Sequence, residues 1–318
     1  MSKTNIRLAV LMDPLHKINI KKDSTYTMLR EASKKGWDIY IFMSNELYFK
    51  NNKYLANACK FKFNQTNQPS WYNTSEQEII DLLSFDIILF RKDPPVNLEY
   101  IYSTYLLEQI ANKGVLVANN PKSIRDCNEK LFATQFPEFS PPTLVTSNMS
   151  LIKEFQKEHQ EIIVKPLDSM GGNSIFKLIP NDSNINVILE ASTLNGSKTI
   201  MAQKFIPEIK DGDKRILMIN GSPVHYGIKR IPDKHDHRGN LAANAKSVGF
   251  RINDHEHEIC HKIGPKLQEL GLHFVGLDVI GNYVTEINVT CPTCIQEIDS
   301  LYDLNIAKSF LEELERML

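Results

Sequence analysis

The chain has 318 residues, a formal net charge of −1, 42% hydrophobic residues and 24% charged residues. This composition is typical of a globular protein with two or three lobes, and it gives no reason to expect nucleic acid or an acidic membrane as a partner. The sequence contains no apolar run near the roughly 18 residues that span a bilayer, and no signal peptide. The cysteines number five, an odd count that favours reduced thiols and a cytoplasmic location.

The first third alternates apolar strands with amphipathic helices. Strands are predicted over Ile6–Met12, Trp37–Met43, Asp86–Phe90 and Val115–Ala118, and helices over 24–35, 75–84 and 97–112. The stretch 46–73 has a weaker pattern that leaves room for a hairpin. This alternation predicts an α/β fold with a parallel, doubly wound sheet. Ligands of such sheets bind at the carboxyl ends of the strands, where Asp13 and Arg91 follow two of them.

Two further lobes are expected after this domain. A helix from Pro121 to about Ala133 leads into the second lobe, with predicted strands at Thr143–Val145, Ile162–Lys165, Ser174–Ile179 and Thr199–Gln203 and helices near 149–159 and 184–194. The third lobe has predicted strands near 214–219, 223–230 and 273–288, and helices near 254–270 and 302–317. Residues 231–249 are polar and without periodicity; long loops of this kind are usually functional, so they predict a lid.

The stretch from Phe274 to Thr290 reads as two apolar strands joined by a tight turn at Gly281-Asn282. Glu286 and Asn288 are two residues apart and so share a face of the second strand, and Asp278 can pair alongside them. Two carboxylates and a carboxamide among aliphatic residues suit a hard divalent cation such as Mg²⁺. A surface hairpin with three unrelated polar residues fits the pattern equally well.

Two other features carry possible chemistry. Lys165 ends a strand and precedes a loop with Gly171 and Gly172, where backbone amides can approach a phosphate, although an ordinary turn explains the loop as well. The guanidinium groups of four isolated arginines can bind carboxylates or phosphates in a bidentate manner. These are Arg91, Arg215, Arg230 and Arg238.

Nine motifs follow one another in an order shared with a known family. They are Met12-Asp-Pro14, 19–24, 91–95, 125–132, 165–168, 170–172, 210–215, 238–243 and 285–290. Through them the chain resembles the ATP-grasp superfamily and, within it, the bacterial type of glutathione synthetase, nearly end to end. The resemblance implies an ATP-grasp fold preceded by the doubly wound domain. The expected domains are an N-terminal substrate-binding domain at 1–122, a central lobe at 123–204 and a C-terminal lobe at 205–318 with the metal site and lid.

The resemblance also implies how ATP and metal are bound. It assigns ATP phosphates to Lys130, Lys165 and the loop with Gly171 and Gly172, and the ribose to Asp213. Adenine would meet the hinge residues Gln203, Lys204, Phe205 and Ile206. Two Mg²⁺ ions, for which Mn²⁺ can substitute, would be held by Asp278, Glu286 and Asn288. The chain departs from the family pattern at Ser169, where the family has glycine, and at Asn244-Ala245 in the lid.

The implied reaction joins gamma-L-glutamyl-L-cysteine and glycine to glutathione, with release of ADP and phosphate, through an acyl phosphate. Arg215, Arg238 and Lys165 would be catalytic. Substrates would meet Asp13, Asn19, Arg91, Arg215, Arg230, Arg238 and Asn240. The implied assembly is a homotetramer.

Three alternatives remain open at this point. One is another carboxylate-amine ligase of the same fold, such as a D-alanine-D-alanine type. Another is a non-catalytic ATP-binding protein like synapsin, against which the retained metal triplet and lysines argue. The third concerns Cys291-Pro-Thr-Cys294, which has the spacing of a redox dithiol but follows the metal hairpin, where the family typically has serine at the first position.

Overall fold

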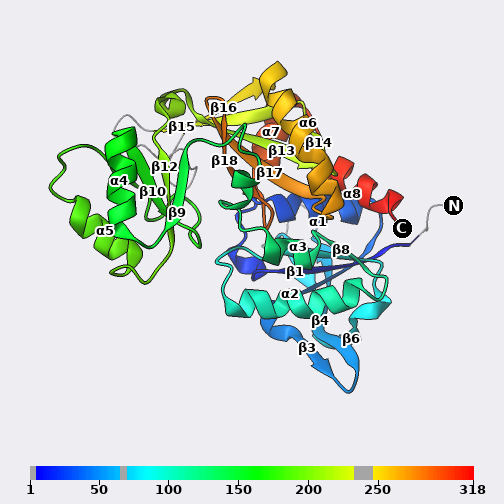
Figure 1. Ribbon diagram of the computed structural model, residues 1–318. Helices are drawn as coiled ribbons and strands as arrows, with labels where there is room; N and C mark the ends of the chain where they lie inside the picture. The colour runs from blue at the N-terminus through cyan, green and yellow to red at the C-terminus, as the bar shows by residue number, and fades with distance from the viewer. Residues whose placement is uncertain (1–4, 65–69, 233–245) are drawn as a thin grey trace.

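The computed structural model describes residues 5–64, 70–232 and 246–318, and it places three β-sheets in three lobes (Figure 1). The N-terminal domain and the third lobe lie against each other, and the second lobe, in green, stands to one side. Within the described residues no helix is both long and apolar enough to cross a membrane.

The N-terminal domain has the predicted doubly wound parallel core. Its parallel strands, in sheet order, are β2 (Asp38–Phe42), β1 (Arg7–Met12), β7 (Ile87–Arg91) and β8 (Leu116–Ala118). Alternate residues of β1 pack on opposite faces: Leu8 and Val10 join the cluster of α1 (Ser24–Lys34), and Ala9 and Leu11 join that of α2 (Leu98–Ala111). The fold class predicted from the sequence is therefore confirmed.

An antiparallel extension continues this sheet beyond β2. It consists of β3 (Leu47–Lys50), β4 (Lys53–Phe63), β5 (Tyr72–Thr74) and β6 (Glu78–Asp81), and β3 and β4 form the hairpin for which the sequence left room. The helix predicted over 75–84 is wrong. Ile80 is buried where β6 pairs with β4, and the Ser75 hydroxyl accepts from Lys60 N instead of capping a helix. Pairing with a distant strand overrides the local helical pattern.

The second lobe is a four-stranded antiparallel sheet. Its order is β11 (Phe176–Leu178), β10 (Ile162–Pro166), β12 (Ile200–Lys204) and β9 (Thr143–Thr146), and α4 (Met149–His159) and α5 (Ile185–Thr193) pack on it. The helix predicted from Pro121 ends earlier, as α3 (Pro121–Asp126), and a 3₁₀ turn follows at Phe132–Gln135. The Asn128 carboxamide accepts from Lys130 N and Leu131 N, which starts a separate turn there.

The third lobe contains a six-stranded antiparallel sheet. The main strands, in sheet order, are β16 (Lys246–Arg251), β15 (Tyr226–Ile231), β13 (Asp213–Ile219), β17 (Phe274–Ile280) and β18 (Tyr283–Asn288), and short β14 (Ser222–Pro223) pairs with β13. Helix α6 (Asp254–Glu269) packs in one core cluster, and α7 (Ile295–Tyr302) and α8 (Ile306–Arg316) pack in the other, together with α1. The N-terminal domain and third lobe thus share hydrophobic core.

Two predictions for this lobe need correction. Residues 246–249, placed in the lid loop, belong to β16, and Lys246 pairs with Ile231 at the end of β15. The middle of the predicted lid, 233–245, lies outside the described residues. The single helix predicted near 302–317 is two helices, α7 and α8, separated at Asp303, which has a left-handed φ of 52°.

Candidate nucleotide and substrate site

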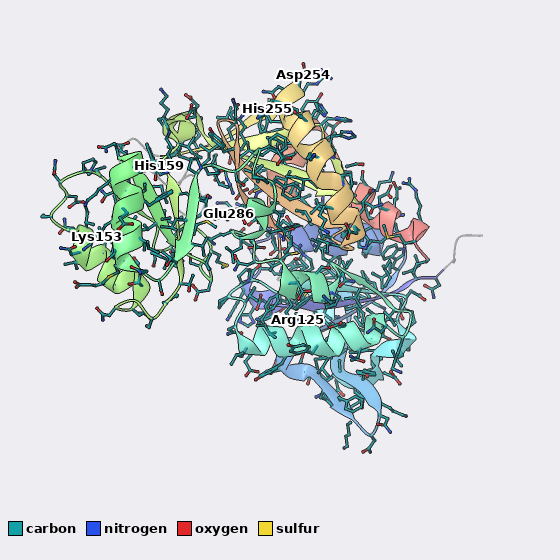
Figure 2. All side chains as sticks on the ribbon, in the orientation of Figure 1. Arg125, Lys153, His159, Asp254, His255 and Glu286 are labelled. Carbon is teal, nitrogen blue, oxygen red and sulfur yellow. The ribbon has the colours of Figure 1, made fainter. Side chains whose placement is uncertain are left out.

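The hairpin of β17 and β18 forms around the predicted turn, with Gly281 at a positive φ of 58° and Ile280 opposite Tyr283. Asp278 pairs with Glu286 and Gly276 pairs with Asn288, so Asp278 comes alongside the other two predicted ligands. A bulge between Asp278 and Val279 interrupts the ladder at this point. Glu286 lies where the three lobes meet (Figure 2).

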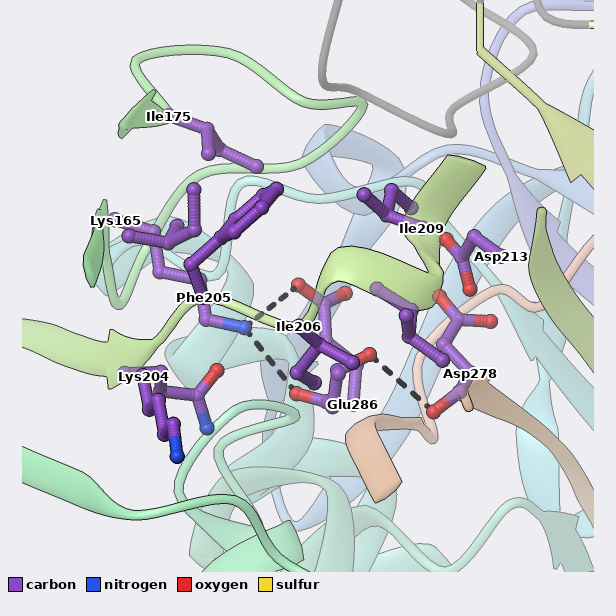
Figure 3. Close-up of a pocket in the computed structure, with 13 residues that line it drawn as sticks. Lys165, Ile175, Lys204, Phe205, Ile206, Ile209, Asp213, Asp278 and Glu286 are labelled. Carbon is purple, nitrogen blue, oxygen red and sulfur yellow. Dashed lines mark hydrogen bonds and ion pairs between the residues drawn. The ribbon is translucent and has the colours of Figure 1, made fainter. Parts of the chain in front are cut away.

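One pocket lies between the second and third lobes (Figure 3). The predicted hinge residues Gln203, Lys204, Phe205 and Ile206 line it, together with Asp213 and the isoleucines at 163, 175, 209 and 280. A pocket with apolar walls and a polar end is typical of a small-molecule site. Glu286, Asp278 and Lys165 are at its polar end.

Two lysines from different elements converge on Glu286. Lys130 Nζ and Lys165 Nζ each lie 3.7 Å from Glu286 Oε1, and both lysines are buried. Lys130 also donates to Ser169 O (2.6 Å), and Lys165 donates to Thr285 O (3.3 Å). Burial lowers the pKa of Lys165, against the opposing effect of Glu286. Two ammonium groups facing one carboxylate leave positive charge that suits phosphate oxygens.

The loop after β10 reaches toward these lysines. Gly171 and Gly172 have positive φ values of 66° and 79°, which glycine adopts without strain. Gly171, Ser169 and Met170 line the cavity that holds the substrate-side residues described below. The serine at 169 thus supplies, through its backbone carbonyl, the contact to Lys130.

A buried network of two arginines and two aspartates lies behind the hairpin. Arg215 donates to both oxygens of Asp278, at 2.5 and 3.0 Å. Arg230 Nη2 lies 3.0 Å from Asp278 Oδ1 and donates to Asp213 Oδ2 at 2.5 Å. Burial alone would raise the pKa of Asp278, but the two guanidinium groups outweigh it and hold that pKa well below its usual value. The guanidinium groups of Arg215 and Arg230 are therefore already paired with carboxylates of the protein.

Asp213 has one oxygen left over. Its Oδ1 is buried and has no hydrogen-bond partner among the described residues, and the side chain lines the pocket of Figure 3. A buried unpaired oxygen at a pocket wall is costly unless a ligand hydroxyl satisfies it. The site therefore fits a ribose hydroxyl at this position.

The pKa of Asp213 gives a testable pH dependence. Burial raises that pKa from 3.8 to about 7, against the opposing effect of Arg230. Because the folded state holds this proton more tightly than the unfolded chain, the resulting stability is present below about pH 4 and is lost as the pH rises to about 7. Wild type should therefore lose more stability than Asp213→Asn between about pH 4 and 7, measured by urea unfolding. The same pH dependence in both proteins would contradict this assignment.

The three predicted metal ligands fit a hard cation through oxygen atoms. Glu286 is partly exposed to both cavities, and Asn288 Nδ2 donates to Gly276 O, which leaves Oδ1 as its metal-binding atom. Asp278 accepts three arginine contacts, so it has about one of its four lone-pair sites left. Within the described residues, no three His, Cys, Asp or Glu side chains form a metal cluster, so the predicted set depends on the Asn288 carboxamide as its third member.

A second cavity opens on the other side of Glu286 and Asp278, which line both. Its wall comes from residues far apart in the sequence: Asp93, Pro94, Glu129, Ser169, Met170, Gly171, Arg215, Arg230, Asn288, Thr290, Cys291, Pro292, Thr293 and Cys294. The two cavities therefore meet at the predicted metal ligands. A nucleotide in the first would present its phosphates to a molecule in the second.

Not all predicted substrate residues line this cavity. Arg91 is buried behind it and donates to Thr25 Oγ1 and to Pro292 O, which supports the wall. Asp13 accepts from Asp93 N and pairs with Lys92, and it lines a separate hollow at the carboxyl end of the sheet. Asn19 is exposed and accepts from Lys21 N. Arg238 and Asn240 lie outside the described residues.

Sequence reasoning gave no role to several residues of the cavity wall. Asp93 and Glu129 stand inside motifs that carry the family resemblance, next to Arg91 and Lys130, and that position was the available signal. Cys291 and Cys294 also line the cavity, and burial raises the pKa of both thiols. Burial thus favours the protonated thiols, which are poorer nucleophiles than thiolates.

Comparison with known proteins places the chain in a family. The N-terminal domain of prokaryotic glutathione synthetase matches residues 6–125, and its ATP-grasp domain matches residues 129–303. A glutathione synthetase of Pseudomonas aeruginosa is 48% identical over 99% of both chains, and one of Coxiella burnetii is 46% identical over 98% of this chain and 97% of its own.

Solved structures agree on the fold. D-cycloserine synthetase DcsG superposes with a TM-score of 0.67 at 13% identity, over 98% of this chain and 99% of that chain. The ATP-grasp ligase PsnB, complexed with a minimal precursor, gives a TM-score of 0.63 at 16% identity, over 98% and 99%. The fold class and the resemblance predicted from the sequence are confirmed. The chain belongs to the prokaryotic glutathione synthetase family and is an ATP-dependent ligase with the ATP-grasp fold.

Proposed function

We propose that the protein makes glutathione by activating gamma-L-glutamyl-L-cysteine with ATP and joining it to glycine. The observation that carries the proposal is the meeting of two cavities at Glu286 and Asp278, beneath Lys130 and Lys165. ATP in the first cavity would direct its γ-phosphoryl group at the cysteinyl carboxylate of the dipeptide in the second. ADP and phosphate are the other products.

The proposed reaction has two steps. The cysteinyl carboxylate takes the γ-phosphoryl group to form an acyl phosphate, and the glycine amine then attacks the carbonyl carbon as phosphate leaves. Lys130 and Lys165 hold the phosphate oxygens, and Arg215 stabilises negative charge at the reacting carboxyl. Such catalysis depends on positioning and charge stabilisation and requires no side-chain nucleophile.

The metal belongs to the same proposal. Glu286, Asn288 and Asp278 would hold two Mg²⁺ ions, or Mn²⁺ in their place, through the oxygens described above. The metal supplies charge that neutralises the phosphate oxygens as the phosphoryl group moves. The Glu286 carboxylate attracts both lysine ammonium groups, which each lie 3.7 Å from its Oε1, and so offsets their mutual repulsion.

The remaining assignments stay proposals. Adenine would contact Gln203, Lys204, Phe205 and Ile206, and ribose would contact Asp213. Asp13, Asn19, Arg91, Arg230, Arg238 and Asn240 would act on the dipeptide or glycine, with Arg238 catalytic, as the family resemblance implies. We also propose a cytoplasmic location, supported by the five cysteines that are all free of disulfides, and a homotetramer.

A direct assay tests the proposal. ATP consumption is measured with gamma-glutamylcysteine and glycine together, with each alone, and with Mg²⁺ replaced by a chelator. We expect phosphate and glutathione to form in equal amounts only when both substrates and metal are present. ATP hydrolysis that does not depend on the dipeptide, or turnover only with D-alanine, would contradict it.

A further inference from the structure

The two carboxylate oxygens of Glu129 differ in their hydrogen bonds to the protein. Oε1 accepts from Val289 N at 2.9 Å, from Thr290 N at 3.0 Å and from the Thr290 hydroxyl at 2.8 Å. The backbone of Glu129 also accepts from Ile287 N, so this residue fastens the start of the second lobe to the end of the metal hairpin. Within the described residues, Oε1 therefore makes all the hydrogen bonds of the Glu129 side chain.

The other oxygen is available to a ligand. Among the described residues, Oε2 of Glu129 receives no hydrogen bond and no lysine, arginine or histidine forms an ion pair with it. The side chain lines the substrate cavity. Burial raises the pKa of Glu129, against the hydrogen bonds from Thr290, so a positive charge brought into the cavity would stabilise the carboxylate.

The other acidic groups of the cavity already have partners. Asp278 is engaged by Arg215 and Arg230, and Glu286 faces Lys130 and Lys165. Asp93 lies on the N-terminal side, near Arg91 and Cys291. Glu129 thus lines the same cavity as Glu286, the carboxylate that faces both lysines, and has one oxygen without a partner among the described residues.

We propose that Glu129 Oε2 binds the ammonium group of the incoming amine substrate and places its nitrogen beside the activated carboxyl. The ammonium group gives up one proton to water before the nitrogen attacks, and the leaving phosphate takes the second proton as the amide forms. This inference rests on the proposed function, in which that amine is glycine. A charge-assisted hydrogen bond of this kind is shorter and stronger than a neutral one and fixes the direction of the nitrogen. Glu129 is a positioning residue for the second substrate, separate from the groups that hold ATP.

The variant Glu129→Gln tests the roles of the two carboxylate oxygens separately. The amide oxygen of glutamine can still accept the three hydrogen bonds from 289–290, and the NH₂ group replaces the free Oε2. The fold and its thermal midpoint should be unchanged, while the KM for glycine should rise roughly 10- to 100-fold, the loss typical of a hydrogen bond to a charged group. The KM values for ATP and dipeptide should stay within about twofold of wild type.

A neutral nucleophile distinguishes a role of Glu129 in binding the ammonium group from a purely structural role. Hydroxylamine is uncharged at neutral pH and traps the acyl phosphate as a hydroxamate, so Glu129→Gln and wild type should form hydroxamate at equal rates. The control Glu138→Gln removes a carboxylate that pairs with Lys262 and does not line the cavity; it should behave as wild type in every assay.

The outcomes are distinguishable. A raised KM for glycine with an unchanged hydroxamate rate supports the inference. An unchanged KM for glycine in Glu129→Gln overturns the inference, and so does an equal loss of rate with glycine and with hydroxylamine. In both cases, normal turnover by the wild-type protein leaves the proposed function intact. A wild-type chain that makes neither glutathione nor hydroxamate overturns the proposed function and this inference with it.

Discussion

Replacing Glu286 with glutamine should nearly abolish turnover while leaving the fold intact. Glu286 lines both cavities and faces Lys130 and Lys165 at 3.7 Å each. A neutral amide holds Mg²⁺ poorly and no longer balances the two ammonium groups. We expect kcat to fall by roughly two to three orders of magnitude, as for the loss of one charged group at the transition state. Initial rates over a range of Mg²⁺ concentrations measure the effect.

The control for this change is Glu269→Gln. Glu269 pairs with Lys266 on the surface of α6 and should alter neither kcat nor stability, because exposed pairs contribute about 0–1 kcal/mol. Circular dichroism of both variants checks the fold. Ordinary turnover by Glu286→Gln at the Mg²⁺ concentration that saturates wild type would remove Glu286 from the metal site.

Replacing Asp278 with asparagine should cost stability even without metal or nucleotide. Asp278 is 3% exposed and accepts from Arg215 and lies against Arg230. Its loss leaves two buried guanidinium groups with only Asp213 as a carboxylate partner. Breaking a buried ion pair from one side typically costs about 3–5 kcal/mol. Urea unfolding in the presence of a chelator measures this free energy apart from any effect on metal binding.

Asp38→Asn provides the matched comparison. Asp38 forms ion pairs with Arg7 and Lys60 at the surface of the N-terminal sheet, so the same chemical change there should cost about 0–1 kcal/mol. Equal losses from Asp278→Asn and Asp38→Asn would show that the buried network does not hold the third lobe together. A larger loss from Asp278→Asn is the expected result.

The sequence by itself determined those features that depend on near neighbours. Gly281 and Asn282 between two apolar runs predict the hairpin, and the structure has its turn there, with Ile280 opposite Tyr283. Asp23 caps α1 by accepting from Tyr26 N, three residues along the chain. Capping and tight turns act over three or four residues, so the signal lies within a short stretch of sequence.

The same local reasoning failed where a distant strand was the partner. Residues 78–81 resemble part of a helix when read alone, but they pair with β4 and bury Ile80. Likewise, residues 246–249 belong to a stretch that predicts loop because it is polar and without periodicity, yet Lys246–Arg251 pairs with β15 along its length. Strand formation depends on a partner that the sequence window does not contain.

The arrangement of the site was decided by tertiary structure. The motifs named Lys130, Lys165 and Glu286 separately, but their convergence needs the second and third lobes to pack together. That Arg215 and Arg230 are engaged by Asp278 follows from the pairing of β13 with β15 and β17. The difference between the two carboxylate oxygens of Glu129 depends on a hydrogen bond from Thr290, which is 161 residues away in the sequence. Contacts at such separation leave no periodicity in the sequence, because they are fixed only when the lobes pack and the cavity closes.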